Sequence, residues 1–368
     1  MRIGLAATIV LATTACSLTT EETTPPPGPP ELASGKAVPS RCAATPPRAS
    51  ATVTFVANGS AWALDPRSGK LTCVFAARRP GPFVWGPRGD RALLAHLEVK
   101  SFGDAPSRPP TSAAPGARSW GRPIGKSIVF VGRGGRALLK AHPAGGGFTN
   151  VTPIPGARYE QVVYHPSGLA FAFIVNNGPR QSLWISSNTG MEPRQLVHGR
   201  FHTSFDAIAF APDGRTLYFA AHHGGAGSHV DLHSASLLGG TEAPVEWRGG
   251  PFERVSGIVS GRRGELAFTA GRSCSSRRAV VVTPDHAKGA DALPGAETSR
   301  AVGWIDDAHL LVAAGGCGRP LDLYSVAARS LAARLLVKGV AAAAVRRPER
   351  LPPPQLPRQA LEGGSGLA

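Results

Sequence analysis

The largest cluster of potential metal ligands in this sequence lies in the segment AHHGGAGSHVDLH (221–233). The cluster consists of His222, His223, His229, Asp231 and His233. If 228–237 forms a strand, alternate side chains share one face, so His229, Asp231 and His233 would project together. Two imidazoles and a carboxylate can bind a first-row transition metal ion. A polar, solvent-facing strand explains the same residues, because ligands from one strand are nearly parallel and a metal needs a further group. The sequence favours the polar strand and leaves the metal triad as an alternative.

The elements that would position this cluster belong to a repeat. Each repeat has a short apolar strand, a turn rich in Pro, Gly or Asp, and a second apolar strand. The six copies are VWGPRGDRALLAHL (84–97), SWGRPIGKSIVFVG (119–132), VYHPSGLAFAFIV (163–175), AFAPDGRTLYFAA (209–221), IVSGRRGELAFTA (258–270) and VGWIDDAHLLVAA (302–314). Equivalent residues recur after 35, 44, 46, 49 and 45 positions. A period near 45 residues that is built of strands is typical of a β-propeller.

Two further strands follow each pair. The expected third strands are SAWALDP (60–66), RALLKAHP (136–143), QSLWISS (181–187), SHVDLHSASL (228–237), RAVVVTP (278–284) and LDLYSVA (321–327), and fourth strands include LTCVF (71–75), FTNVTPI (148–154), RQLVHG (194–199) and ARLLVKG (333–339). One repeat is therefore a four-stranded meander. A single meander cannot bury both of its faces, so the repeats must stack as blades around an axis. The predicted fold class is all-β, a propeller of four-stranded blades.

The two ends of the chain indicate how the ring closes. VTFVANG (53–59) and the two strands after it lack a first strand, and VAAAAVRR (340–347) is a first strand with nothing after it. Their pairing would complete one blade and gives seven blades. The weakest repeat is 83–117, where RALLAHLEVKSFG is followed by DAPSRPPTSAAPG and no clear final hairpin is present. If that segment is not a blade, the count is six.

The N-terminal residues are typical of export. A dozen apolar or small residues follow Arg2 and end at Cys16, which is too short for a membrane-spanning helix and suits a signal peptide. TTAC resembles a bacterial lipoprotein cleavage box, so we expect residues 1–15 to be removed and Cys16 to carry lipid; an ordinary signal peptide is the alternative. Residues 16–50, rich in Thr and Pro, would form a disordered tether. The propeller would then span 51–347, followed by a flexible tail over 348–368.

Four cysteines remain beyond Cys16, an even number that suits disulfides in an exported chain. Cys274 and Cys317 each follow the second strand of consecutive repeats, and equivalent loops of neighbouring blades lie side by side. The repeat phase therefore favours a Cys274–Cys317 bond and leaves Cys42 to pair with Cys73. Free buried thiols are the alternative.

The chain carries 40 Lys and Arg against 24 Asp and Glu, a formal net charge of +16. This excess fits an anionic partner such as lipid headgroups, an envelope polymer or an acidic protein. Export and the lack of basic runs interleaved with aromatics disfavour nucleic acid. The G-x-S-x-G elbow of serine hydrolases is missing from the sequence.

The segment AFAPDGRTLYFAA resembles the F-S-P-D-G signature of TolB-type, WD40-like (PD40) propeller repeats, through Phe210, Pro212, Asp213 and Gly214. The resemblance covers roughly 52–347. It implies a periplasmic or cell-surface binding platform, although the partner-binding N-terminal domain of TolB is replaced here by the tether.

We therefore expect a non-enzymatic, lipid-anchored, outward-facing propeller that binds an envelope protein or an anionic polymer, with no cofactor. The competing expectation is a metal-dependent enzyme, because some propellers with PD40 repeats are lyases that act on acidic sugars. A divalent metal at His229, Asp231 and His233 belongs to that alternative.

Overall fold

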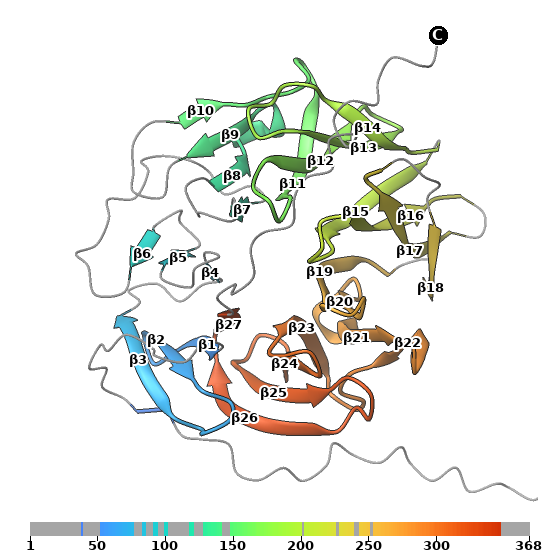
Figure 1. Cartoon of the computed structure of the whole chain (residues 1–368). Helices are drawn as coiled ribbons and strands as arrows, with labels where there is room; N and C mark the ends of the chain where they lie inside the picture. Colours follow the sequence, from blue (N-terminus) through green and yellow to red (C-terminus); the bar gives the residue numbers. More distant parts are fainter. Residues whose placement is uncertain are drawn as a thin grey trace, which may run out of the picture.

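The structure is a computed structural model. It describes residues 38–39, 52–76, 83–85, 91–94, 99–101, 118–120, 128–141, 148–200, 202–225, 228–238, 243–250 and 253–346. These residues form seven antiparallel sheets, of which six have four strands and one has three. Figure 1 shows the sheets arranged around a central axis, and we number them as blades 1 to 7. Within the described ranges, no helix is long and apolar enough to cross a membrane.

The strands of the first three blades are short. Blade 1 contains β27 (Ala342–Arg346), β1 (Thr52–Ala57), β2 (Ser60–Leu64) and β3 (Leu71–Ala76); blade 2 contains β4 (Phe83–Trp85), β5 (Arg91–Leu94) and β6 (Val99–Ser101); and blade 3 contains β7 (Arg118–Trp120), β8 (Ile128–Val131), β9 (Leu138–Ala141) and β10 (Phe148–Asn150), with the 3-10 turn η1 (Arg133–Gly135).

The other four blades have strands of five to eight residues. Blade 4 contains β11 (Arg158–Tyr164), β12 (Ala170–Asn176), β13 (Gln181–Ser187) and β14 (Arg194–His198); blade 5 contains β15 (Thr203–Phe210), β16 (Thr216–His223), β17 (His229–Ser236) and β18 (Ala243–Gly249); blade 6 contains β19 (Val255–Ser260), β20 (Leu266–Ala270), η2 (Cys274–Ser276), β21 (Arg278–Thr283) and β22 (His286–Asp291); and blade 7 contains β23 (Thr298–Trp304), β24 (His309–Gly315), β25 (Leu321–Ala327) and β26 (Ala333–Val340).

We letter the strands of each blade A to D in their order from the axis outwards. The A strands β27, β4, β7, β11, β15, β19 and β23 lie nearest the centre in Figure 1. Because neighbouring strands are antiparallel, each A strand begins at the end of the ring where the B strand ends and the C strand begins. We call this end the B–C rim and the opposite end the A–B rim.

The two terminal strands of the described chain pair in blade 1. β1 is antiparallel to β27, from Thr52 opposite Arg346 to Val56 opposite Ala342. The Thr54 hydroxyl also donates a hydrogen bond to the Ala344 carbonyl, with an O···O distance of 2.7 Å. This is the pairing of N- and C-terminal strands that the sequence predicts.

Blade 2 is formed by the weakest repeat of the sequence. The segment RALLAHLEVKSFG contains two strands, β5 and β6, which pair with each other. The segment therefore supplies strands B and C of a blade, and seven sheets are present, the count that the sequence favours over six. The rest of this repeat, 102–117, lies outside the described residues.

The hydrophobic core lies between the blades. The cluster between blades 1 and 7, for example, joins the fully buried Val53 and Phe55 to Leu311, Leu323 and Val337. Similar clusters join blades 3 and 4, 4 and 5, 5 and 6, and 6 and 7. Blades 4 to 7 are thus each buried against two neighbours, which explains why a single repeat could not be stable alone.

The PD40-like signature forms the A–B turn of blade 5. Gly214 has φ of 70°, which a residue with a side chain rarely adopts, and its N–H bonds the Ala211 carbonyl. The Asp213 carboxylate accepts a hydrogen bond from the Arg215 N–H at 2.9 Å. Pro212 precedes these residues on the exposed side of the turn. The signature therefore encodes a tight hairpin.

The same signature connects blades 4 and 5. His165, fully buried in the A–B turn of blade 4, approaches the Gly214 carbonyl through Nε2 at 2.7 Å. Its other ring nitrogen lies 2.7 Å from the Ser167 hydroxyl, and its ring packs edge-on against Phe210. Burial lowers the pKa of His165 below 6.5, against the opposing effects of the Gly214 carbonyl and Asp213.

We expect acid to destabilise the propeller through His165. Below its ordinary pKa of 6.5 the unfolded chain binds a proton there that the folded chain does not. The stability present above that pH is therefore lost progressively as the pH falls towards the lowered pKa of the folded state. Urea unfolding across this range should show a shallower pH dependence in a His165→Gln variant. An identical pH dependence in both proteins would contradict the prediction.

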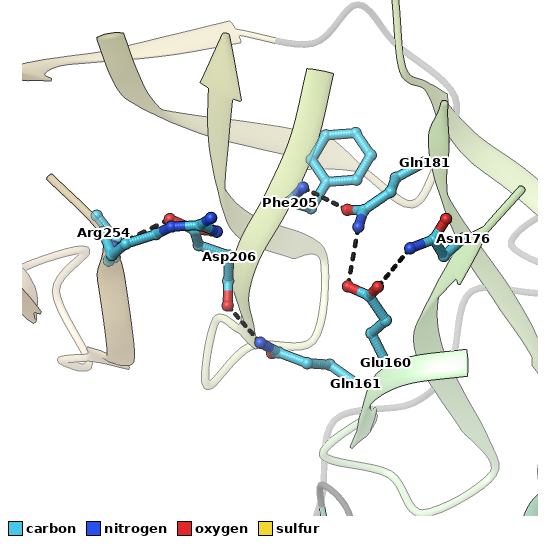
Figure 2. Close-up of polar contacts among 8 residues, drawn as sticks. Glu160, Gln161, Asn176, Gln181, Phe205, Asp206 and Arg254 are labelled. Carbon is cyan, nitrogen blue, oxygen red and sulfur yellow. Dashed lines mark hydrogen bonds and ion pairs between the residues drawn. The ribbon is translucent and has the colours of Figure 1, made fainter. Parts of the chain in front are cut away.

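Polar side chains connect the blades at the B–C rim (Figure 2). The chain bulges within β15, and the Asp206 side chain, 5% exposed, accepts from Arg254 and from the Val255 N–H of blade 6. In blade 4, Gln181 donates to Glu160 at 2.8 Å and accepts from the Phe205 N–H of blade 5. A bulge changes the direction of a side chain, and the bulge in β15 directs Asp206 at blade 6.

Candidate functional site

The B–C rim carries a pocket lined by three arginines. Its volume is about 390 Å³, and Arg277, Arg300 and Arg319 contribute to its wall together with Cys274. Arg277 follows η2 in blade 6, Arg300 lies in β23, and Arg319 precedes β25 in blade 7. Blades 6 and 7 thus build the pocket together, and the connection from β26 to β27 completes its wall through Val340 and Ala341.

The residues that line this pocket carry positive charge and no negative charge. No acidic residue lines it. In the described part of the chain, no carboxylate forms an ion pair with Arg277, Arg300 or Arg319. By contrast, other arginines of this rim do have acidic partners: Arg248 pairs with Asp231, Arg254 with Asp206, and Arg278 with Glu253. The pocket is therefore a local concentration of positive charge.

The environment penalises the positive charge of Arg300. Burial lowers the pKa of its guanidinium, and repulsion from Arg277 lowers that pKa further. A bound anion would offset both effects, because an opposite charge at close range favours the ionised form of a group. Guanidinium groups present forked N–H donors that match carboxylate and phosphate. This arrangement suits binding of an anionic group.

A disulfide fixes the wall of the pocket. Cys274, in the B–C connection of blade 6, is bonded to Cys317 in the B–C connection of blade 7, with Cα atoms 5.7 Å apart. This is the pair that the repeat phase favours. Cys73 is also disulfide-bonded, whereas Cys42 and Cys16 lie outside the described residues.

A second cluster lies at the B–C hairpin of blade 5. One ligand atom from each of His223, His229 and Asp231 lies within 4.8 Å of the others. His229 Nε2 is 3.0 Å and His223 Nε2 is 3.8 Å from Asp231 Oδ2. These side chains are 31%, 26% and 14% exposed for His223, His229 and Asp231 respectively.

The structure groups His229 and Asp231 with His223, whereas the alternative triad read from the sequence combined them with His233. The His233 ring stacks on Phe219, with centroids 5.4 Å apart and planes at 16°, and packs edge-on against His223 at 6.2 Å. In the antiparallel register, His233 lies opposite Phe219, whereas His229 lies opposite His223. His223 is therefore the third member of the cluster, and His233 is not. The pairing of β16 with β17 sets His223 directly opposite His229.

Sequence reasoning missed the arginine pocket, although a signal was present. Arg277 comes three residues after Cys274, and Arg319 comes two residues after Cys317. The repeat period that places the two cysteines in neighbouring loops also places these arginines there. Arg300 could not have been added in this way, because it belongs to an A strand and not to a B–C connection.

The sheet topology defines a β-propeller. No family model matches the sequence, and a search of curated proteins likewise gave no match. Among solved structures, the chain is similar to a prolyl endopeptidase, with 12% identity, a TM-score of 0.55 and coverage of 80% of this chain. This chain spans 50% of that protein.

Two further solved structures are similar. An oligogalacturonate lyase in complex with manganese has 13% identity and a TM-score of 0.54, with coverage of 74% of this chain and 84% of that one. TolB from Acinetobacter baumannii has 12% identity and a TM-score of 0.45, with coverage of 81% and 65%. At these identities the likeness concerns the fold alone.

Proposed function

We propose that this protein is an exported, non-enzymatic propeller that binds anionic groups of an envelope polymer or protein at its B–C rim. The observation that carries this proposal is the pocket lined by Arg277, Arg300 and Arg319, whose charges have no acidic partner among the described residues. A lipid on Cys16 and the tether over 16–50 would hold the ring at the membrane surface.

The charge of the whole chain supports this proposal. A formal net charge of +16 attracts polyanions over a distance, and the pocket then supplies directional contacts. Arginine suits this role better than lysine, because its planar group can donate two parallel hydrogen bonds to one carboxylate or phosphate. The ligand class is therefore a polymer or protein segment that bears carboxylate or phosphate groups.

The disulfides support export to an oxidising compartment. Such bonds form and persist in oxidising environments and are rare in reducing ones. The Cys274–Cys317 bond and the bonded Cys73 therefore suggest an exported protein. The part of the proposal that concerns lipid on Cys16 depends on the sequence of the N-terminus alone.

The test is direct binding of a polyuronate and of a polyphosphate to the full chain, measured by calorimetry at several salt concentrations. We expect an Arg277→Ala, Arg300→Ala variant to bind at least about tenfold more weakly, since a hydrogen bond to a charged group contributes about 1.5–3 kcal/mol. Arg300→Lys keeps the charge but loses the forked geometry, so we expect an intermediate affinity.

The matched control is Arg262→Ala, which removes an exposed arginine from the A–B turn of blade 6, at the opposite rim. It lowers the net charge without touching the pocket. If this variant weakens binding as much as a single pocket variant, the attraction is a property of the net charge. If the pocket variants bind as tightly as the wild type, the proposed site is wrong.

A metal-dependent lyase that acts on acidic polysaccharide is the second candidate function. The His223, His229 and Asp231 cluster favours it, as does the structural likeness to an oligogalacturonate lyase in complex with manganese. Against it, the cluster lies in blade 5 and the arginine pocket lies between blades 6 and 7, so the two would not act on one sugar unit. Incubation of the polyuronate with protein and Mn²⁺ distinguishes the candidates, because a lyase releases shorter unsaturated fragments and a binding protein leaves the polymer intact.

A further inference from the structure

We propose that His223, His229 and Asp231 form a binding site for one divalent transition metal ion at the B–C hairpin of blade 5. The site uses none of the residues of the arginine pocket and does not depend on the proposed function. It differs from a site on one strand, because two neighbouring strands supply its ligands.

The hairpin register brings the three side chains together. His223 on β16 lies directly opposite His229 on β17, and Ala221 lies opposite Asp231. Directly opposed residues of an antiparallel pair project from the same face of the sheet, and so do alternate residues of one strand. All three ligands therefore leave one face of blade 5, and they meet near the end of the hairpin, where β16 ends and β17 begins.

The separations between the ligand atoms fit a transition metal ion. Metal–nitrogen and metal–oxygen bonds of about 2.0–2.1 Å in a tetrahedron place neighbouring ligand atoms about 3.3 Å apart. The two histidine Nε2 atoms lie 3.0 and 3.8 Å from Asp231 Oδ2. The rings of His223 and His229 have centroids 4.8 Å apart, so side-chain rotation on binding would bring all three ligand atoms around one ion.

Contacts around the cluster orient its ligands. Arg248 donates from Nε to Asp231 Oδ1 at 3.0 Å, so the other oxygen, Oδ2, faces the two imidazoles. Hydrogen bonds to a ligating carboxylate are a regular feature of metal sites. His233, held by its stack on Phe219, packs against the ring of His223. Arg248 and His233 are therefore positioning residues and not ligands.

The donor set selects the class of ion. Two imidazole nitrogens and one carboxylate oxygen suit Zn²⁺, Co²⁺ or Ni²⁺, whereas Ca²⁺ requires six to eight oxygen ligands and Mg²⁺ prefers an octahedron of oxygens. The partial exposure of His223 and His229 leaves access for water as a further ligand. Zn²⁺ is the appropriate probe, and Co²⁺ is its spectroscopic substitute.

The test is Zn²⁺ titration of the chelator-treated full chain in competition with a chromophoric chelator. We expect about one equivalent to bind, and His223→Ala or Asp231→Asn to weaken binding by more than the roughly 10- to 100-fold typical of losing a supporting contact. His233→Phe preserves the stacking surface and should retain the affinity within a few fold. The control is His309→Ala. His309 Nδ1 lies 2.9 Å from Asp306 Oδ1, and neither residue belongs to the proposed metal site.

A second measurement uses the wild-type protein alone. Bound Co²⁺ should give the strong visible absorption of a site with four or five ligands, together with shifted imidazole NMR signals. The proposal is overturned if Co²⁺ shows only the weak absorption of the hydrated ion. Equal loss of affinity in His309→Ala, or abolished binding in His233→Phe, would also overturn it.

Discussion

Truncation of the chain after Val340, which removes β27, is expected to lower the free energy of unfolding by about 5 kcal/mol. This value takes about 1 kcal/mol for each of the five residue pairs that β27 forms with β1. The melting temperature should fall by roughly 10 °C. β1 would lose its neighbour towards the axis, and the edge from Thr52 to Val56 would have no partner strand. Phe55, fully buried in the core between blades 1 and 7, would become accessible to water. Thermal and urea unfolding followed by circular dichroism measure the loss.

Truncation after Arg346 is the matched control. It removes residues 347–368 and leaves β27 complete. The difference in stability between the two truncated proteins isolates the contribution of the strand. If both proteins melt at the temperature of the full chain, the pairing of β1 with β27 contributes nothing to stability, and the blades hold together through the other interfaces alone.

Removal of the Cys274–Cys317 bond is expected to lower the free energy of unfolding by about 4 kcal/mol. The bond joins residues 43 positions apart, and the chain-entropy relation for a loop of that length gives this value at 25 °C. The variant Cys274→Ser, Cys317→Ser removes the bond with little change in the size of both side chains. Urea unfolding of this variant beside the wild type measures the cost, and non-reducing peptide mapping of the wild type verifies the linkage.

The same variant also tests the arginine pocket. Cys274 lines the pocket, and the bond fixes the two connections that carry Arg277 and Arg319. We expect polyanion binding to weaken in the folded variant at a temperature well below its melting point. If stability falls but affinity is unchanged, the bond stabilises the ring without organising the pocket. Unchanged stability would contradict the expected contribution of the bond.

The local sequence determined the hairpin turns and the order of strands in most blades. A tight turn such as Pro212-Asp213-Gly214 is encoded by the residues that occupy it, because Gly214 needs a positive φ and Asp213 bonds the backbone two residues ahead. The turn then sets the register in which the apolar strands on each side pair. For this reason the order of strands in blades 4 to 7 could be predicted from the sequence.

The repeat period determined some contacts over long distances. In a propeller, equivalent loops of consecutive blades are neighbours, so the phase of Cys274 and Cys317 was enough to favour their bond. The unmatched strands at the two ends likewise predicted the pairing of β1 with β27. Blade 2 was harder, because β5 and β6 have only four and three residues and no turn residue such as Pro or Gly lies between them.

Only the tertiary structure decided the composition of the two candidate sites. Alternation along one strand predicted His229, Asp231 and His233, but the register between β16 and β17 brings His223 beside His229, and the stack on Phe219 takes His233 away. The arginine pocket combines side chains from an A strand and from two B–C connections. The metal site depends on the register between two strands, and the pocket depends on which blades face each other. Alternation along a single strand carries no information about either.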